Sequence, residues 1–164
     1  MRIRTATIED LDKLSVLFEG YRTFYRKTPD YEAARAFLRE RIERRESEIF
    51  IAYSADEQLA GFVQLYPIFS STRLKRLWLL NDLFVDPLYR GQGLSVELID
   101  AAKALCHRTE ACGLMLETAK NNLIGNQLYV QTGFVLDGGH NFYYWDVPAA
   151  TVNGELLVEQ QGLN

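Results

Sequence analysis

The sequence contains few of the residues from which metal sites and disulfide frameworks are built. Its 164 residues include two cysteines and two histidines. Cys106, Cys112 and the neighbouring His107 are fewer than the about four ligands that a structural zinc site needs. Neither cysteine lies in the base-adjacent setting of a covalent nucleophile. We therefore predict no metal, no acyl-enzyme and two ordinary thiols in a reduced, cytoplasmic protein.

Long apolar runs and an excess of positive charge are also missing. No apolar run approaches the roughly 20 residues that span a bilayer, and no apolar block follows the N-terminal charges as in a signal peptide. Lysine and arginine number 18 against 22 acidic residues, which gives a formal net charge of −4. Because nucleic-acid binding needs a basic surface, we predict neither a nucleic-acid nor a membrane partner. The acidic balance suits a cationic substrate.

The composition and periodicity are those of one globular domain. Hydrophobic residues make up 48% and charged residues 24%, and the length fits a single core. Apolar periodicity predicts strands over residues 2–7, 48–54, 58–66, 74–85 (with a bulge), 113–118, 134–135 and 142–147, and helices over 8–25, 31–46, 91–108 and 122–132. This order predicts a mixed α/β domain over residues 1–147, built on a central sheet, and a C-terminal tail over 148–164.

The most informative segment lies between a predicted strand and a predicted helix. Gly91 and Gly93 allow backbone conformations that other residues resist, and they leave N–H groups open to a ligand. The following helix presents its positive dipole end at the same place, and Arg90 adds a fixed charge. These features predict an anion site suited to a pyrophosphate; the alternative is a plain strand-to-helix turn. Val96 stands where a dinucleotide motif needs a third glycine, and no Walker-type lysine follows.

Three segments resemble those of one family, the GNAT acetyltransferases. Arg90-Gly91-Gln92-Gly93-Leu94-Ser95 resembles the signature R/Q-x-x-G-x-G/A, with Ser95 at the last small position. Asn81-Asp82-Leu83-Phe84-Val85 resembles the family's fourth strand. Asn122 to Tyr129, followed by Gly133-Phe134, resembles N-x-x-A-x-x-L/F-Y…G-F/Y, with Gly125 in place of alanine. The resemblance extends over residues 1–147. It implies the GNAT fold, a central mixed twisted sheet of about six to seven strands flanked by about four helices.

The resemblance also implies acetyl-CoA as the cosubstrate. In the family the loop's N–H groups hold the pyrophosphate, and the backbone of Leu83 and Val85 would pair with the pantetheine arm. The Asn122 amide would bind coenzyme A, although an asparagine at a helix start also serves as an N-cap. The predicted cofactor-binding residues are Leu83, Phe84, Val85, Arg90, Gly91, Gln92, Gly93, Leu94, Ser95, Val96 and Asn122.

Two side chains are the main candidates for the chemistry. With the family resemblance, Tyr129 is the predicted general acid, since a phenol of pKa about 10 can protonate a leaving thiolate; packing is the alternative. Asp82 lies in an otherwise apolar strand, where a lone buried charge is expensive. We expect it to bind a cationic amine, with a structural ion pair as the alternative. Strand alternation places Asp82 and Phe84 on the opposite sheet face from Leu83.

The remaining candidates are weaker. Glu117 is a second candidate base, with structural hydrogen bonding equally able to explain it. Tyr21 and Tyr25 fall on one helical face and either line the acceptor pocket or, as we favour, pack in the core. We expect His107 on the surface and His140 in a loop.

Within the family, the strand around Asp82 and the pair Leu128-Tyr129 resemble the diamine, spermidine/spermine and fungal polyamine/histone acetyltransferases. Asn81 stands where the spermidine/spermine enzymes carry a glutamate, so that base is not carried over. The sequence predicts direct transfer of an acetyl group to a primary amine, such as a polyamine, diamine, other small amine or lysine, through a ternary complex. By family analogy the enzyme is a homodimer. The alternative is a non-catalytic acetyl-CoA sensor or interaction module on the same fold.

Overall fold

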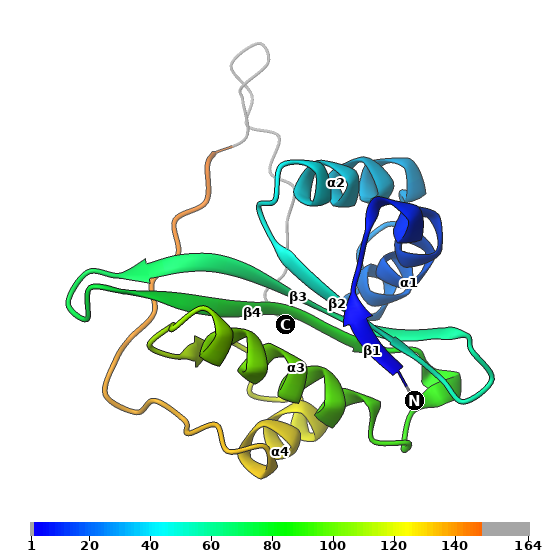
Figure 1. Cartoon of the computed structure of the whole chain (residues 1–164). Helices are drawn as coiled ribbons and strands as arrows, with labels where there is room; N and C mark the ends of the chain where they lie inside the picture. The colour runs from blue at the N-terminus through cyan, green and yellow to red at the C-terminus, as the bar shows by residue number, and fades with distance from the viewer. Residues whose placement is uncertain (1, 149–164) are drawn as a thin grey trace. The chain divides into compact units, whose positions relative to one another are not determined.

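The structure is a computed structural model that describes residues 2–148 (Figure 1). Residues 2–134 belong to one compact unit, and residues 135–148 belong to a second, which is described by itself. The strands are β1 (Arg2–Thr5), β2 (Glu48–Tyr53), β3 (Leu59–Ser70), β4 (Lys75–Val85) and β5 (Leu114–Met115). The helices are α1 (Leu11–Phe24), α2 (Tyr31–Glu43), α3 (Leu94–Arg108) and α4 (Leu123–Gln131), with 3-10 turns η1 (Ile8–Asp10) and η2 (Pro87–Tyr89).

The strands form one mixed sheet in the order β1-β2-β3-β4-β5. Neighbouring strands are antiparallel from β1 to β4, and β5 lies parallel to β4 through the pairs Trp78–Leu114 and Leu79–Met115. Helices α1 and α2 cover one face, and α3 and α4 lie on the other (Figure 1). The predicted mixed α/β fold with four helices is therefore confirmed. None of the helices within residues 2–148 is both long and apolar enough to cross a membrane.

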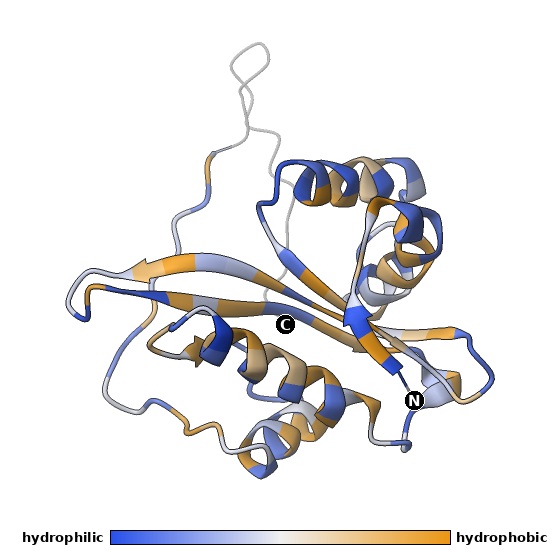
Figure 2. Ribbon diagram, viewed as in Figure 1, coloured by the Kyte–Doolittle hydropathy of each residue, from blue (hydrophilic) through white to orange (hydrophobic). Residues whose placement is uncertain are grey.

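Each sheet face closes over its own apolar core. On the α3 face, Leu98, Ile99 and Ala102 pack against Val63 and Leu65 of β3, and all five are fully buried. A second cluster on the α1 face joins residues of α1 and α2 to the other side of the same strands; its members include Leu14, Leu38, Ile51, Phe62 and Phe84. Figure 2 shows hydrophobic and hydrophilic residues alternating around the helices, as amphipathic helices require.

A buried carboxylate fixes the entry into α1. Asp10 accepts hydrogen bonds from the backbone N–H of Thr7 at 2.8 Å and from both terminal nitrogens of Arg4 at 2.6 and 2.7 Å. The bonds from Arg4 are the largest cause that lowers the pKa of Asp10 to about 2. The helix start predicted around Thr7 thus carries a capping carboxylate from the first turn.

The C-terminal strands predicted over 134–135 and 142–147 do not form, because residues 135–148 contain neither helix nor strand. The sheet within residues 2–148 therefore has five strands rather than about six to seven. The strand predicted over 113–118 is the two-residue β5. An apolar or aromatic run becomes a strand only when it finds a ladder partner. Phe142 to Trp145 form no strand, and their side chains are exposed. The tail predicted beyond residue 148 lies outside the described residues.

Candidate active site

A one-residue bulge in β4 decides which side chains reach which face of the sheet. Gln64 of β3 pairs with Asp82, and the next residue, Leu65, pairs with Leu80, so Asn81 has no partner on β3. The extra residue reverses the alternation. Leu80 joins the α3-face core before the bulge, whereas Phe84 joins the α1-face core after it. Asp82 therefore points with Phe84 to the α1 face. The predicted bulge and the predicted facing of these side chains are confirmed.

Asp82 is buried, with 4% of its surface exposed, and its hydrogen bonds come from neutral donors. Gln64 Nε2 donates to Oδ2 at 2.8 Å, and Asn81 Nδ2 donates to Oδ1 at 3.1 Å. Gln64 is itself fully buried and accepts a bond from Ser47 Oγ at 2.9 Å. No ion pair within residues 2–148 includes Asp82, so the structural ion pair that we had weighed is absent from this part of the chain.

Three tyrosines surround this carboxylate. The pKa of Tyr21 is raised mainly by burial, then by the charge of Asp82 and a hydrogen bond with it. The same two causes, burial and then the charge of Asp82, raise the pKa of Tyr25, and they raise that of Tyr66 to about 12. The rings of Tyr21 and Tyr25 meet edge to face with centroids 5.0 Å apart. Tyr21 packs on the α1-face core, as we favoured, and its hydroxyl faces Asp82, whereas Tyr25 is exposed. A role of either tyrosine in the acceptor pocket stays a prediction.

Helix α4 brings Tyr129 to the same place. Burial raises the pKa of Tyr129 to about 12, with the neighbouring phenol of Tyr25 as the second cause. The Tyr129 ring packs edge to face on Phe134 at 5.7 Å, beside the α3-face core. The packing alternative is therefore borne out, and the role of the hydroxyl as a general acid stays a prediction. With its pKa about two units above the ordinary value, the phenol stays protonated at neutral pH and can donate a proton.

The edge of β4 beyond the bulge is open. Toward β5, only Trp78 and Leu79 of β4 are paired within the described part of the chain. Leu83 and Val85 pair with β3 on their other side and pack half-buried against the α3-face core. A ligand with amide groups could therefore extend the sheet along this edge, as predicted for the pantetheine arm.

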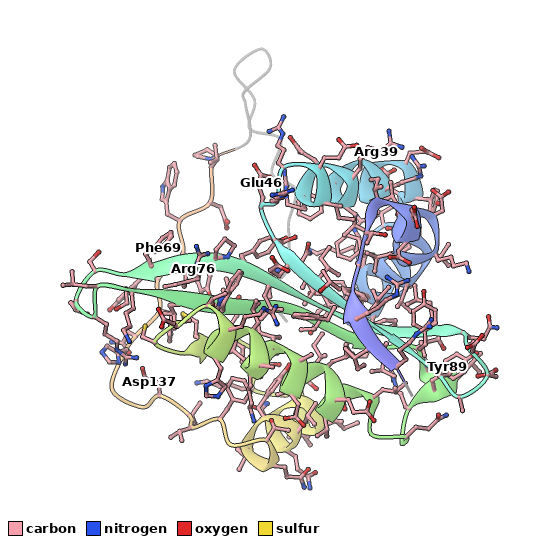
Figure 3. The ribbon with its side chains drawn as sticks, viewed as in Figure 1. Arg39, Glu46, Phe69, Arg76, Tyr89 and Asp137 are labelled. Carbon is pink, nitrogen blue, oxygen red and sulfur yellow. The ribbon has the colours of Figure 1, made fainter. Side chains whose placement is uncertain are left out.

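The loop after β4 has the backbone that an anion site needs. Gly91 and Gly93 adopt left-handed conformations, with φ of 76° and 81°. Within residues 2–148, no protein acceptor bonds the backbone N–H groups from Gly91 to Ser95. Leu94 starts α3 and buries its side chain in the core, so it can offer a ligand its backbone alone. Figure 3 shows Tyr89 in the turn that leads from β4 into this loop. These N–H groups lie at the start of α3, where a helix leaves its first N–H groups without an intrahelical partner.

The Arg90 side chain is bonded to the end of β4. Its Nε donates to the carbonyl of Val85 at 3.0 Å, and its guanidinium lies 5.7 Å from the ring of Phe24 and 5.8 Å from that of Phe84. These groups border a groove of about 440 Å³ between α1 and the segment after β4, which Lys13 also lines. The predicted contact between Arg90 and a phosphate therefore requires this side chain to turn toward the loop.

Asn122 is an N-cap. Its Oδ1 accepts from the backbone N–H of Gly125 at 3.1 Å, and its Nδ2 donates to Thr118 Oγ1 at 3.0 Å. A Cβ at position 125 would collide with the Asn122 amide, so glycine at this position allows the cap. The cap is shown, and a contact of Asn122 with coenzyme A stays a prediction.

The other candidates lie where the sequence placed them or away from the site. His107 is exposed, and His140 is an exposed residue of the second unit, paired with Asp137 at 2.7 Å. No group of three or more His, Cys, Asp or Glu side chains within residues 2–148 is arranged to hold a metal ion. Sequence reasoning missed Gln64, Ser47 and Tyr66. The polar Gln64 in an apolar strand was the one available signal.

Comparisons with known proteins agree with this geometry. The model of the acetyltransferase (GNAT) family matches residues 12–134. The uncharacterized N-acetyltransferase YhfO of Bacillus subtilis (strain 168) is 43% identical over 149 residues, which cover 91% of this chain and 99% of that protein. A streptothricin acetyltransferase of Escherichia coli is 30% identical over 89 residues, or 54% of this chain and 48% of that one.

Among solved structures, a probable acetyltransferase matches with a TM-score of 0.86 and 38% identity, covering 92% of this chain and all of that one. By sequence, a probable acetyltransferase of Haemophilus influenzae is 36% identical over 121 residues, which cover 74% of this chain and 83% of that protein. The chain belongs to the acetyltransferase (GNAT) family, and by that membership it is an acetyl-CoA-dependent N-acetyltransferase.

Proposed function

We propose that the protein transfers an acetyl group from acetyl-CoA directly to a cationic primary amine, in a ternary complex. One observation carries the proposal. A buried carboxylate, Asp82, has no cationic partner within residues 2–148, is surrounded by tyrosines, and lies next to the open edge of β4. A buried charge without a partner is costly unless a ligand supplies one. An ammonium group would do so.

The cosubstrate fits the loop and the strand edge. The unbonded N–H groups between Gly91 and Ser95 would receive the pyrophosphate, and the backbone of Leu83 and Val85 would pair with the pantetheine arm. This placement leads the thioester toward Asn81 and Asp82. Phe84 lies on the same strand, and its side chain packs in the α1-face core. Acetyl-CoA supplies the acyl group and a thiolate leaving group.

The amine must lose a proton before it attacks. An alkylamine has a pKa of about 10.4, so it arrives as an ammonium, which Asp82 attracts. Its proton leaves through water, and the neutral nitrogen attacks the thioester carbon. Collapse of the tetrahedral intermediate breaks the carbon–sulfur bond, and Tyr129 donates its phenolic proton to the thiolate. The excess proton on the new amide nitrogen restores the tyrosine, directly or through water.

Cofactor binding is tested by thermal unfolding with acetyl-CoA. Ligand at 100 times its dissociation constant should add about 2.7 kcal/mol of stability. Gly93→Val should remove most of that shift, because valine is strained at a φ of 81° and narrows the loop. A wild type that shows no shift with millimolar acetyl-CoA would contradict the proposal.

The rival function is a non-catalytic acetyl-CoA sensor. The half-buried phenol of Tyr129, which lies beside Tyr25 of α1, favours catalysis. Initial velocities measured over both substrates should give intersecting lines, as a ternary complex requires. Parallel lines would point to an acyl-enzyme, and thermal stabilisation by acetyl-CoA without thiol release by any amine would support the sensor.

The acceptor class is the finer part of the proposal. The carboxylate–tyrosine site and the net charge of −4 favour diamines and polyamines. The likeness to a streptothricin acetyltransferase makes an antibiotic the second candidate to test. A cytoplasmic homodimer also belongs to the proposal, and sedimentation of the purified protein tests the dimer.

A further inference from the structure

The buried amide of Gln64 links a serine at the start of β2 to the carboxylate of Asp82. Gln64 is fully buried in β3, and both ends of its amide are bonded. Its Oε1 accepts from Ser47 Oγ at 2.9 Å, and its Nε2 donates to Asp82 Oδ2 at 2.8 Å. The register between β3 and β4 pairs Gln64 with Asp82, and the bulge at Asn81 immediately precedes that pair.

The carboxylate sets the direction of this chain, and the serine satisfies its other end. A carboxylate accepts hydrogen bonds, so the NH₂ group of Gln64 turns toward Asp82, and Oε1 is left to accept from the Ser47 hydroxyl. Asn81 Nδ2 bonds the other carboxylate oxygen at 3.1 Å. Each carboxylate oxygen has two acceptor sites; each has received one amide donor, and the Tyr21 hydroxyl bonds the same carboxylate. The plane of the carboxylate is thereby held while it can still accept from an incoming ammonium.

The donors are neutral, which preserves the charge. A lysine or arginine at position 64 would hold the carboxylate equally well but would cancel its attraction for a cation. The other groups that face Asp82 are the phenols of Tyr21, Tyr25 and Tyr66. Arg41, which acts on Tyr66, is paired with Glu40 and Glu46 at 2.7 Å each. Figure 3 shows Glu46 just beyond α2. Within residues 2–148, no cationic side chain forms an ion pair with Asp82.

We propose that Gln64 is a positioning residue for the acceptor: anchored by Ser47 at its carbonyl end, its amide orients Asp82 toward the ammonium group of the substrate. This inference rests on the proposed function, because it takes Asp82 as the group that binds the amine. It adds a specificity role for a β3 residue and for the serine that precedes β2. A purely structural Gln64 would stabilise the fold without affecting the choice of amine.

The first test is Gln64→Leu, which keeps the size and an apolar core but removes the donor. The acceptor is whichever of putrescine, spermidine and a lysine peptide the wild type acetylates fastest. We expect KM for that amine to rise about tenfold, since a bond to a charged group is lost. KM for acetyl-CoA should stay within twofold.

Two further variants grade the effect. Ser47→Ala frees the amide to rotate and should raise KM for the amine by a smaller factor, whereas Ser47→Thr keeps the hydroxyl and should restore it. Gln58→Leu is the matched control, because Gln58 is an exposed glutamine immediately before β3. It should behave as wild type in both KM values.

The decisive variant exchanges the two groups, Gln64→Glu with Asp82→Asn. The pair and its hydrogen bond survive, so thermal stability should return toward the wild-type value. The carboxylate now lies on β3, so KM for the amine should stay at least tenfold high. Recovery of the wild-type KM in the exchanged protein, or an unchanged KM for the amine in Gln64→Leu, would overturn the positioning role alone. A wild type that acetylates none of the three amines would overturn the proposed function and this inference together.

Discussion

Helices close both faces of the sheet, but the strands present different side chains to each face. On the α3 face, the buried residues that pack together are all apolar, with Leu98, Ile99 and Leu105 of α3 at the centre. On the α1 face, the same strands carry Gln64 and Asp82, both buried, among aromatic rings. The α3 face resembles an ordinary core, and the α1 face holds polar groups that an ordinary core would exclude. We infer that the α3 face supplies stability and that the α1 face sacrifices some of it for binding.

The largest effect is expected for Tyr129, whose ring packs against the α3-face core and whose phenol neighbours Tyr25 of α1. Tyr129→Phe keeps the ring that packs on Phe134 and removes the proton donor. General acid catalysis is typically worth about 10² to 10⁴-fold, so kcat should fall by roughly that factor. Steady-state kinetics and a thermal melt measure the two properties. Since the pKa of Tyr129 is raised to about 12, the phenol should stay protonated and kcat should show no loss from its ionisation up to pH 10. Full activity in the variant would remove Tyr129 from the chemistry.

A core residue of the α3 face should behave in the opposite way. Leu98 is fully buried, and Leu98→Ala should lower the free energy of unfolding by about 2–5 kcal/mol. Denaturant unfolding measures this loss. At a temperature where the variant is folded, both KM values and kcat should match the wild type. A selective rise in KM for the amine would show that the two faces are not separate in function.

Asp82→Asn should weaken amine binding. Removing the charge costs about 1.5–3 kcal/mol of bonding to a charged group, which raises KM for a diamine or polyamine roughly tenfold or more. KM for acetyl-CoA should change little, because the loop around Gly93 is untouched. Amine titrations at saturating acetyl-CoA provide the comparison. An unchanged KM for every polyamine would end the assignment of this carboxylate to the acceptor.

The smallest effect concerns a carboxylate with a purely structural role. The pKa of Asp10 is lowered from 3.8 to about 2, first by its hydrogen bonds from Arg4. The ionised form therefore stabilises the fold fully above about pH 4, and this stabilisation is lost as the pH falls toward 2. Arg4 is partly exposed, so we expect Asp10→Asn to cost about 1–2 kcal/mol at pH 7. Thermal melts should show the gap narrowing below pH 4 with activity unchanged; a gap independent of pH would contradict the ion pair.

The sequence predicted the features that depend on local pattern. Apolar periodicity located four helices and the bulged strand, and alternation placed Asp82 and Phe84 on one face. It could not supply the partner of Asp82, because that depends on the register between β3 and β4. A shift of one residue would have replaced Gln64 with an apolar neighbour.

The remaining differences have the same origin in tertiary pairing. The aromatic segment that begins at Phe142 has the composition of a strand, but it forms no strand within residues 2–148. The Arg90 guanidinium lies over the rings of Phe24 and Phe84. Phe24 belongs to α1 and is distant in the sequence, so the motif around Arg90 could not predict this contact. Side-chain direction at the loop was therefore beyond what the motif could indicate.

The most direct test of the whole account is thiol release from acetyl-CoA with amines of different charge. Putrescine, spermidine, a lysine peptide and an aminoglycoside are compared with glutamate, and mass spectrometry identifies the acetylated products. The account predicts that kcat/KM for the best cationic amine exceeds that for glutamate by at least about tenfold, the factor expected for one charged hydrogen bond. Preference for glutamate, or no thiol release above the rate without acceptor for any cationic amine, would contradict it.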